Sequence, residues 1–289
     1  MQELPEKPTG VALLITATRL TVQNWRYLAW VSGPMYAVTM SLADITRHLI
    51  EGDISSPPTW PFLALAFVTM VLVVLILSAN AIGWHRLLAR HSAQTTPMSV
   101  LRRLPYWSYI WRAGLLCVPA FGVAIAIGMP IHLISPPIWG TDLPIGSLPY
   151  RIVFYLEIYF RDWLVPFLIS GTITLIGFGF PAVALGHKVP LWHAIKSSLS
   201  YAPQMMIALV LLDITTFAVV EVAGTQLRDL FFDVTTQTSI PFDWGAAILS
   251  SLISVFVTMI NLAILTCTYL HWIAQQKRPA EADLLNVFS

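Results

Sequence analysis

Long apolar runs alternate with short polar segments along the whole chain. A helix that crosses about 30 Å of hydrocarbon needs roughly 20 apolar residues, and its backbone polar groups must bond within the helix. Six runs that are free or nearly free of charge meet this requirement, although the first is short. They cover residues 27–43, 60–84, 113–131, 163–186, 202–220 and 244–270. The pattern predicts an all-α membrane protein with six transmembrane helices in a single domain, residues 1–289.

The Lys and Arg residues predict the orientation of these helices. When the segments between the runs are assigned alternately to two sides, the side with both termini holds twelve of the sixteen Lys and Arg residues. The other side holds four of them, together with ten of the fifteen acidic residues. Because short cytoplasmic loops are enriched in Lys and Arg, both termini are predicted to be cytoplasmic.

The composition narrows the function classes. Hydrophobic residues make up 56% of the chain and charged residues 11%, whereas about a quarter of the residues in soluble domains are charged. A soluble enzyme and a nucleic-acid-binding module are therefore excluded, and no nucleic-acid partner is expected. The two cysteines, Cys117 and Cys267, lie in apolar runs, so we expect neither a disulfide framework nor a zinc site.

Three segments with similar features precede the odd-numbered helices. Each begins with a turn-prone pair and continues as a short interfacial helix that carries basic residues. These segments are residues 9–26, 96–112 and 189–201. The even-numbered helices end in similar sequences that contain His85, His187 and His271. We therefore interpret the chain as three repeats of an interfacial helix and a transmembrane hairpin, with bounds 9–95, 96–188 and 189–275.

Two short motifs resemble a known group of membrane proteins. One is the stretch 180–186, Phe-Pro-Ala-Val-Ala-Leu-Gly, which is followed by Ala194 in a basic amphipathic segment, and the other is Trp84-His85-Arg86. Together they resemble uncharacterised polytopic inner-membrane proteins of proteobacteria. They are also similar to the membrane domain joined to some glycerophosphodiester phosphodiesterases. The resemblance implies a multi-pass protein of a bacterial inner (plasma) membrane, and it carries over no catalytic residue.

Common catalytic motifs are absent from the sequence. There is no His-Glu-x-x-His, Gly-x-Ser-x-Gly, Walker-type phosphate loop or Cys-x-x-Cys, so the chain is predicted to be non-enzymatic and to need no cofactor. If the repeats close into a bundle, His85, His187 and His271 could meet at its inner mouth as a shared metal site. Interfacial anchoring of these histidines is the favoured alternative.

The loop after the second helix is strongly basic. It contains five arginines and no acid between residues 85 and 112, namely Arg86, Arg90, Arg102, Arg103 and Arg112. These arginines are candidates for binding anionic lipid headgroups or an acidic partner. The favoured alternative is that they only fix the topology.

One acid lies inside an apolar run. Asp213 is in the fifth run, where a carboxylate costs about 2.5 to 3.5 kcal/mol on insertion scales, so it should face the protein interior. On antiparallel helices, Asp213 and Asn261 lie at the same depth, about 15 Å from the inner boundary. We predict that they form an intramembrane polar pair, either as a hydrogen bond that fixes packing or as part of a proton- or substrate-binding site.

These features favour a non-catalytic integral inner-membrane protein that acts as a scaffold, accessory subunit or assembly factor. Its expected partners are membrane lipids and a second membrane protein. The alternative is a transporter or lipid translocator with a site in the helix bundle, because Gly33-Pro34, Pro119 and Pro203 interrupt the odd-numbered helices and breaks of this kind can expose backbone groups to a substrate.

Overall fold

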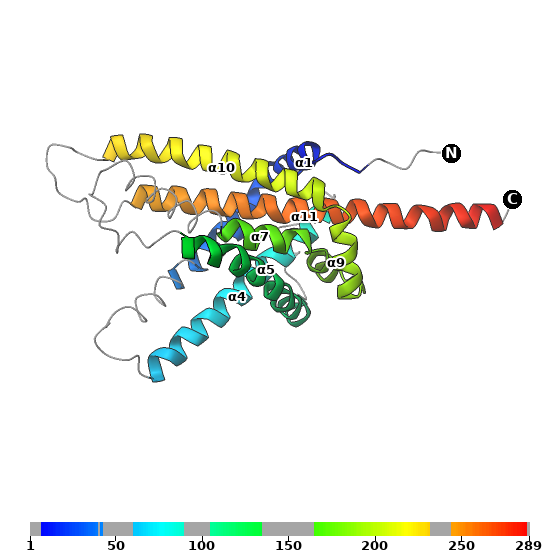
Figure 1. The fold of residues 1–289 in the computed structure, drawn as a ribbon, viewed down its shortest axis with the longest axis horizontal. Coiled ribbons are helices and arrows are strands. Elements are labelled where there is room, and N and C mark those ends of the chain that lie inside the picture. The colour runs from blue at the N-terminus through cyan, green and yellow to red at the C-terminus, as the bar shows by residue number, and fades with distance from the viewer. Residues whose placement is uncertain are drawn as a thin grey trace.

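The computed structural model describes residues 7–39, 41–42, 60–89, 105–134, 165–231 and 244–287. This part of the chain is all-helical and contains no strand, as predicted (Figure 1). Its helices are α1 Gly10–Gln23, α2 Trp25–Tyr27, η1 Leu28–Ser32, α4 Trp60–Ala89, α5 Tyr106–Ile134, α7 Val165–Leu175, α8 Gly179–Ala184, α9 Leu191–Leu199, α10 Ala202–Phe231 and α11 Trp244–Val287. η1 is a π-helical turn, and residues 33–39 continue from it as an α-helix.

Four of the described helices are long and apolar enough to cross a membrane. Their candidate spans are Ala64–Ala89 in α4, Tyr106–Ile127 in α5, Ala202–Val219 in α10 and Leu252–Gln276 in α11. They correspond to the second, third, fifth and sixth predicted spans. Four of the six predicted apolar runs are therefore helices that are compatible with a membrane protein.

The first and fourth predicted spans are not continuous α-helices. The fourth, residues 163–186, is divided into α7 and α8 by a turn at residues 176–178. Gly177 permits this turn, because a Cβ atom on it would lie 2.5 Å from the carbonyl oxygen of Ile173. In the first, η1 interrupts the α-helix. The prediction of six continuous spans is therefore not confirmed. The sequence did not indicate these breaks, because hydropathy is the same for a continuous and a broken apolar helix.

The directions of the helices follow from contacts at one end of the bundle. The end of α4 meets the start of α5 through His85 and Tyr109. The segment after α8 meets α11 through His187 and Tyr269, and the start of α10 meets the later part of α11 through Tyr201. Hence α4 and α8 lead toward this end, and α5 and α10 begin there. We call it the histidine end, defined by His85, His187 and His271.

The interfacial helices are only partly as predicted. α1 has 14 residues, or about 21 Å, which is too short to cross a bilayer. α9 is a second short helix directly before α10. Residues 106–112, by contrast, form the first turns of α5, because the sequence between Pro105 and the following apolar run contains no helix breaker. Residues 96–104 lie outside the described residues, and the threefold repeat is not confirmed.

α1 packs closely against the start of α10. A Cβ atom on Gly10 would lie 2.6 Å from Cβ of Ile207 and 2.7 Å from the carbonyl oxygen of Gln204, so only glycine allows this approach. Just before α1, the Lys7 ammonium donates to the carbonyl oxygen of Ser200 at 2.8 Å. The beginning of the described chain therefore lies at the histidine end.

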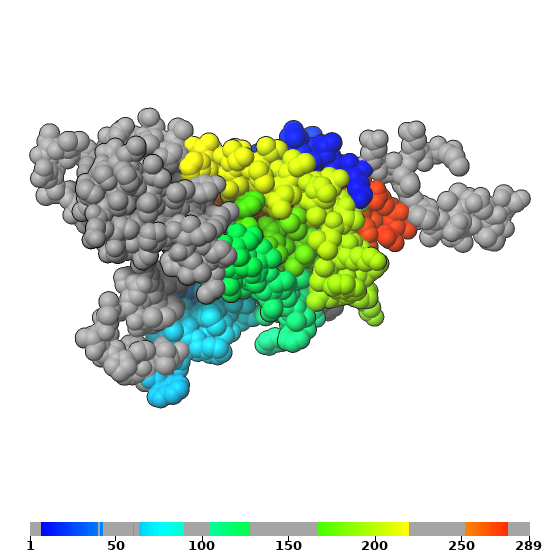
Figure 2. Space-filling model, in the orientation of Figure 1, coloured from blue at the N-terminus to red at the C-terminus, as the bar shows by residue number. Residues whose placement is uncertain are grey.

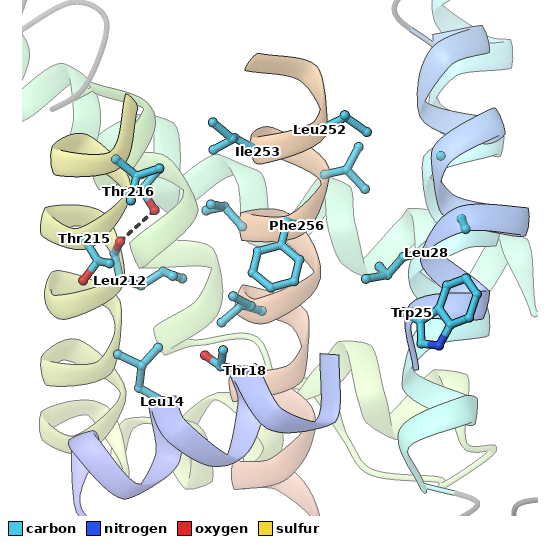
Figure 3. A pocket seen from close by; sticks show the side chains of 16 residues that line it. Leu14, Thr18, Trp25, Leu28, Leu212, Thr215, Thr216, Leu252, Ile253 and Phe256 are labelled. Carbon is cyan, nitrogen blue, oxygen red and sulfur yellow. Dashed lines mark hydrogen bonds between the residues drawn. The ribbon is translucent and has the colours of Figure 1, made fainter. Parts of the chain in front are cut away.

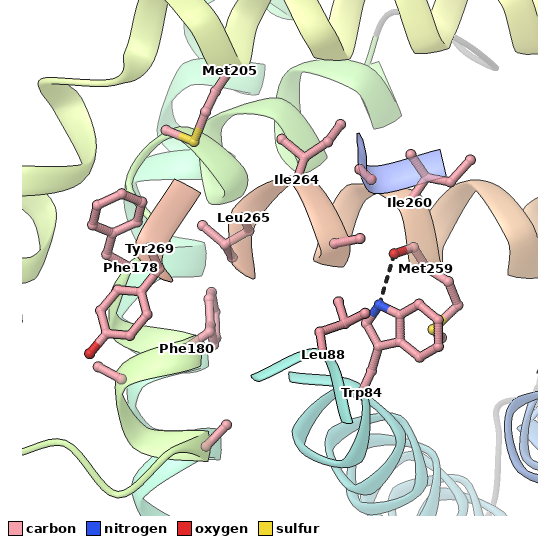
Figure 4. Packing of buried hydrophobic residues seen from close by; sticks show 14 of the residues in the cluster. Trp84, Leu88, Phe178, Phe180, Met205, Met259, Ile260, Ile264, Leu265 and Tyr269 are labelled. Carbon is pink, nitrogen blue, oxygen red and sulfur yellow. Dashed lines mark hydrogen bonds between the residues drawn. The ribbon is translucent and has the colours of Figure 1, made fainter. Parts of the chain in front are cut away.

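α11 is the central helix of the bundle. Half of its candidate span is buried, against 17–28% for α4, α5 and α10. On the face shown in Figure 2, only a small part of α11 is visible, near the C-terminal end of its described side chains. Figure 4 shows the core around it, where Trp84 of α4 donates from Nε1 to the carbonyl oxygen of Met259 at 3.0 Å. The polar end of a large buried ring is thereby satisfied by the helix it packs on.

Candidate functional site

His85 joins three helices at the histidine end. It is fully buried, with Nδ1 2.7 Å from Oγ1 of Thr266 and Nε2 3.3 Å from the hydroxyl oxygen of Tyr109. The Thr266 hydroxyl already donates its hydrogen to the carbonyl of Leu262 at 2.6 Å, so it accepts from Nδ1 of His85. Nε2 then accepts from Tyr109. Both nitrogens of a neutral imidazole are thus used to connect α4, α5 and α11.

The other two candidate histidines each pair with a tyrosine of their own. Nδ1 of His187 lies 2.7 Å from the Tyr269 hydroxyl. Nδ1 of His271 lies 3.0 Å from the hydroxyl of Tyr201, which donates to Oε1 of Gln275 at 2.8 Å. Burial raises the pKa of the Tyr201 hydroxyl, so it remains a donor at neutral pH.

These three histidines do not form a shared metal site in the structure. Within the described residues, no three His, Cys, Asp or Glu side chains come close enough together to hold a metal ion. The histidines were expected to converge because each ends a predicted repeat. They lie at the same end of the bundle, but each is directed to the tyrosine of a different element: Tyr109 in α5, Tyr269 in α11 and Tyr201 before α10.

An aromatic cluster supports this end of the bundle. Phe178, in the turn between α7 and α8, is fully buried, and its ring centroid lies 5.6 Å from Tyr269, 5.8 Å from Trp272 and 5.9 Å from Tyr201. Such distances are those of favourable aromatic pairs. The histidine boundary was predictable from the sequence, but Phe178 was not, because a single Phe within an apolar run carries no distinguishing signal.

The two described arginines of the basic loop are bound to backbone carbonyls. Arg86 donates from Nε to Ala184 at 2.8 Å. Arg112 donates from Nη1 to Gly179 at 3.3 Å and from Nη2 to Val189 at 2.8 Å. Both therefore hold α8 and the segment after it. The remaining candidates, Arg90, Arg102 and Arg103, lie outside the described residues, and binding of lipid or an acidic partner by this loop stays a prediction.

The intramembrane polar pair is not joined by a hydrogen bond in the described part of the chain. Asp213 of α10 is half-buried, and Oδ1 of Asn261 in α11 is buried without a hydrogen-bond partner there. α10 and α11 do contact each other, so the predicted helix pairing is present. The matched depth of Asp213 and Asn261 fixes their height along the helices but not the faces that they occupy.

The described structure contains an apolar groove. Its volume is about 670 Å³, and it lies between α1, the α2–η1 segment, α10 and α11 (Figure 3). Leu14 and Thr18 lie at its α1 end, and Leu252 lies at the opposite end. The hydroxyls of Thr215 and Thr216 each donate to the carbonyl four residues earlier in α10, so these side chains present mainly methyl groups. No single segment contains enough of the lining to predict the groove from sequence.

The motif 180–186 has a clear structural role. Its end forms a C-terminal cap in which Gly186 has φ +80°, its N–H bonds to the carbonyl of Val183, and the N–H of His187 bonds to the carbonyl of Ala182. This is the Schellman arrangement, for which glycine is preferred. The cap reverses the chain directly before His187, and thereby presents its ring to Tyr269.

No protein-family model, curated protein or solved structure matches the chain. The resemblance carried by residues 180–186 and by Trp84-His85-Arg86 is therefore not tested by these comparisons. In the structure, both motifs lie at the histidine end, where Arg86 donates to the carbonyl of Ala184.

Proposed function

We propose that the protein is a non-catalytic integral membrane protein of the bacterial inner membrane, with cytoplasmic N- and C-termini, that acts as a scaffold, accessory subunit or assembly factor. The observation that carries this proposal is that the His, Tyr and Arg side chains at the histidine end form hydrogen bonds within the protein. His85, Tyr109 and Tyr201 bond to other side chains, and Arg112 bonds to backbone. Groups engaged in this way hold helices together, and the Tyr109–His85 pair, although it is bonded as a nucleophile with its base would be, is buried in the core.

The outer faces of α4 and α5 support a role in binding other membrane components. Only 28% of the α4 span and 17% of the α5 span are buried. The exposed residues are apolar and include Phe67 of α4, at 62% exposure, and Val118 of α5, at 71%. Lipid tails or the helices of a second membrane protein would cover these faces, because apolar surface of this extent does not remain in water.

The alternative, a transporter or lipid translocator, is favoured by the break between α7 and α8, because broken helices form substrate sites in many transporters. Several polar groups at this break are already bonded within the protein. The Gly177 N–H bonds to Thr174, the Phe180 N–H bonds to Gly177, and Arg112 donates to the carbonyl of Gly179. Bonded groups support fixed packing more than a polar substrate site, so we place the scaffold role first.

The experiment that tests the proposal is purification from native membranes in lipid nanodiscs with a matched pair of variants. Gly122 lies on α5, and a Cβ atom there would meet nothing within 4 Å, so Gly122→Phe fits the isolated chain. We expect a stoichiometric partner with the wild-type protein and loss of that partner with Gly122→Phe, since small residues allow close packing of membrane helices. The control, Val210→Phe on the exposed side of α10, should retain it.

Two results would contradict the scaffold proposal. The first is purification of the wild-type protein without any partner in stoichiometric amount. The second is a substrate or lipid flux in vesicles that contain the purified protein alone, which would favour the transporter alternative. If a partner is found and both variants retain it, the proposed function stands, but α5 is not the contact surface.

A further inference from the structure

We propose that the groove between α1, the α2–η1 segment, α10 and α11 binds one acyl chain of an anionic phospholipid, whose headgroup lies beside Trp25 and Arg26. The inference rests on the proposed function only in placing these helices in a bilayer. It requires no protein partner. It adds a defined lipid site in a region that the basic-loop prediction does not include.

The first step concerns the chemistry of the groove. Its lining contains no ionisable side chain, and along α11 it extends from Leu252 to Ile260, which is about 12 Å of helix. The hydroxyls of Thr215 and Thr216 in α10 donate to their own backbone, and the other polar side chains of the lining, Thr18 and Trp25, belong to α1 and α2. An apolar chain is therefore the ligand that the α10 and α11 walls accept with little desolvation cost.

The second step is the size of the groove. A partner helix is 10–12 Å in diameter, and 12 Å of its length fills about 900 to 1,400 Å³. The groove has a volume of about 670 Å³, which is too small to receive a whole helix but accommodates a single hydrocarbon chain. The size therefore favours a lipid chain over an inserted segment of another protein.

The third step is the irregular backbone along one wall. η1 is a π-helical turn, and the groove is lined there by Leu28, Ala29 and, directly after the turn, Gly33. Alanine and glycine leave space at the wall, and π-turns within helices occur frequently at functional sites. The π-helical turn η1 thus forms part of the wall that a ligand in the groove would contact.

The fourth step is the charge at the α1 end. Trp25 lines the groove and is 57% exposed, and the Arg26 guanidinium carbon lies 5.9 Å from the centroid of its ring. Among the described residues, no acidic side chain forms an ion pair with Arg26. Trp favours the headgroup level of a membrane, and an exposed Arg beside it attracts a lipid phosphate. This geometry places a negatively charged headgroup at the end of the groove.

The test is photolabelling of the full-length purified protein in phosphatidylcholine vesicles. A trace lipid, either phosphatidylglycerol or phosphatidylcholine, carries a photoreactive group near the end of one acyl chain, and labelled residues are found by mass spectrometry. We expect labelling of α10 at 212–219 and of α11 at 252–260 to exceed labelling of the exposed α5 residues 118, 119, 121–123 and 125–127. We also expect more labelling of the groove by phosphatidylglycerol than by phosphatidylcholine.

Matched variants decide the assignment. Ala29→Trp fills the groove and should remove most of its labelling, whereas Ala126→Trp on exposed α5 should leave it unchanged. Thr215→Phe fills the opposite wall and gives the same answer if Ala29→Trp does not yield a monodisperse protein. Arg26→Gln should reduce the preference for phosphatidylglycerol over phosphatidylcholine by about fivefold.

Three outcomes would overturn the inference. Equal labelling of the groove and of α5 would show that only bulk lipid is present. Unchanged labelling in a folded groove-filling variant would show that no chain occupies the groove. An unchanged lipid preference in Arg26→Gln would overturn the headgroup assignment. Because the experiment contains no partner protein, its result is separate from that of the nanodisc purification.

Discussion

At the residue scale, His85 is the point at which α4, α5 and α11 are connected. Its ring is fully buried, and replacement by phenylalanine keeps the approximate shape but leaves the Tyr109 hydroxyl without its acceptor. We expect His85→Phe to lower the free energy of unfolding by about 1–3 kcal/mol, the cost of an unsatisfied buried polar group. Thermal unfolding of the purified protein in one detergent, followed by circular dichroism, measures the change.

A second substitution separates the hydrogen bond from the packing. Thr266→Val removes the acceptor of Nδ1 but keeps the side-chain shape, and the double variant His85→Phe/Thr266→Val should be less destabilised than the two single changes added together. Strict additivity would mean that the contact of 2.7 Å contributes nothing to stability. It would also remove the argument that this end of the bundle is structural.

Gly186 provides a prediction about one backbone conformation. Its φ of +80° is unfavourable for any residue with a Cβ atom, so Gly186→Ala should destabilise the protein by about 1–2 kcal/mol. Gly171 in α7 is the matched control, because a Cβ atom there would meet nothing within 4 Å, and alanine is favoured over glycine in a helix by about 1 kcal/mol. The two substitutions should shift the melting temperature in opposite directions. Equal shifts would contradict the assigned cap.

At the element scale, the break between α7 and α8 depends on a side chain from α5. Arg112 bonds the carbonyls of Gly179 and Val189 through separate guanidinium nitrogens. Lysine carries the same charge but has only one nitrogen, so it cannot reproduce this planar pair of donors. Arg112→Lys should therefore loosen residues 179–190 and speed their amide hydrogen exchange. Arg19→Lys, at an exposed position of α1, is the control, and similar exchange in both variants would mean that Arg112 does not hold this segment.

The helices and the breaks between them show which features of the fold could be predicted from the sequence and which could not. Hydropathy located α4, α5, α10 and α11, because each contains a long apolar span. It could not predict η1 or the turn at 176–178, since neither changes the apolar pattern. The position of His85 at a helix end was predictable from its neighbours. Its partner Thr266 was not, because that contact depends on how α4 lies against α11.

The roles of the charged and polar side chains were the features that the sequence predicted least well. Arg112 contributed to a count of basic residues that indicated topology and a lipid surface, yet its guanidinium binds two carbonyls. Asp213 and Asn261 were matched in depth, but depth does not determine whether two side chains face each other. In both cases, the local sequence determines the chemical type of a side chain and its depth along the helix, while tertiary contacts determine its hydrogen-bond partner.

At the scale of the whole molecule, the arrangement predicts that both ends of the chain are on one side of the membrane. Lys7 bonds to Ser200, directly before Tyr201, whose hydroxyl donates to Gln275 near the end of the described α11 side chains. Trp60 begins α4, which runs toward the histidine end, so it lies at the other end of the bundle. The excess of Lys and Arg on the terminal side predicts that this side is cytoplasmic.

Single cysteines test this topology in intact cells. After replacement of Cys117 and Cys267 by alanine, Lys7→Cys and Gln276→Cys should react with a membrane-impermeant maleimide only when the cytoplasmic side is opened. Trp60→Cys, at a position that is 84% exposed, should react from outside. Labelling of Lys7→Cys and Gln276→Cys from opposite sides would contradict the histidine end as a single boundary. Labelling of both Lys7→Cys and Gln276→Cys from outside would be consistent with the helix arrangement but would reverse its orientation in the membrane. The contacts determine how the helices are arranged relative to one another, and only the distribution of positive charge predicts which end faces the cytoplasm.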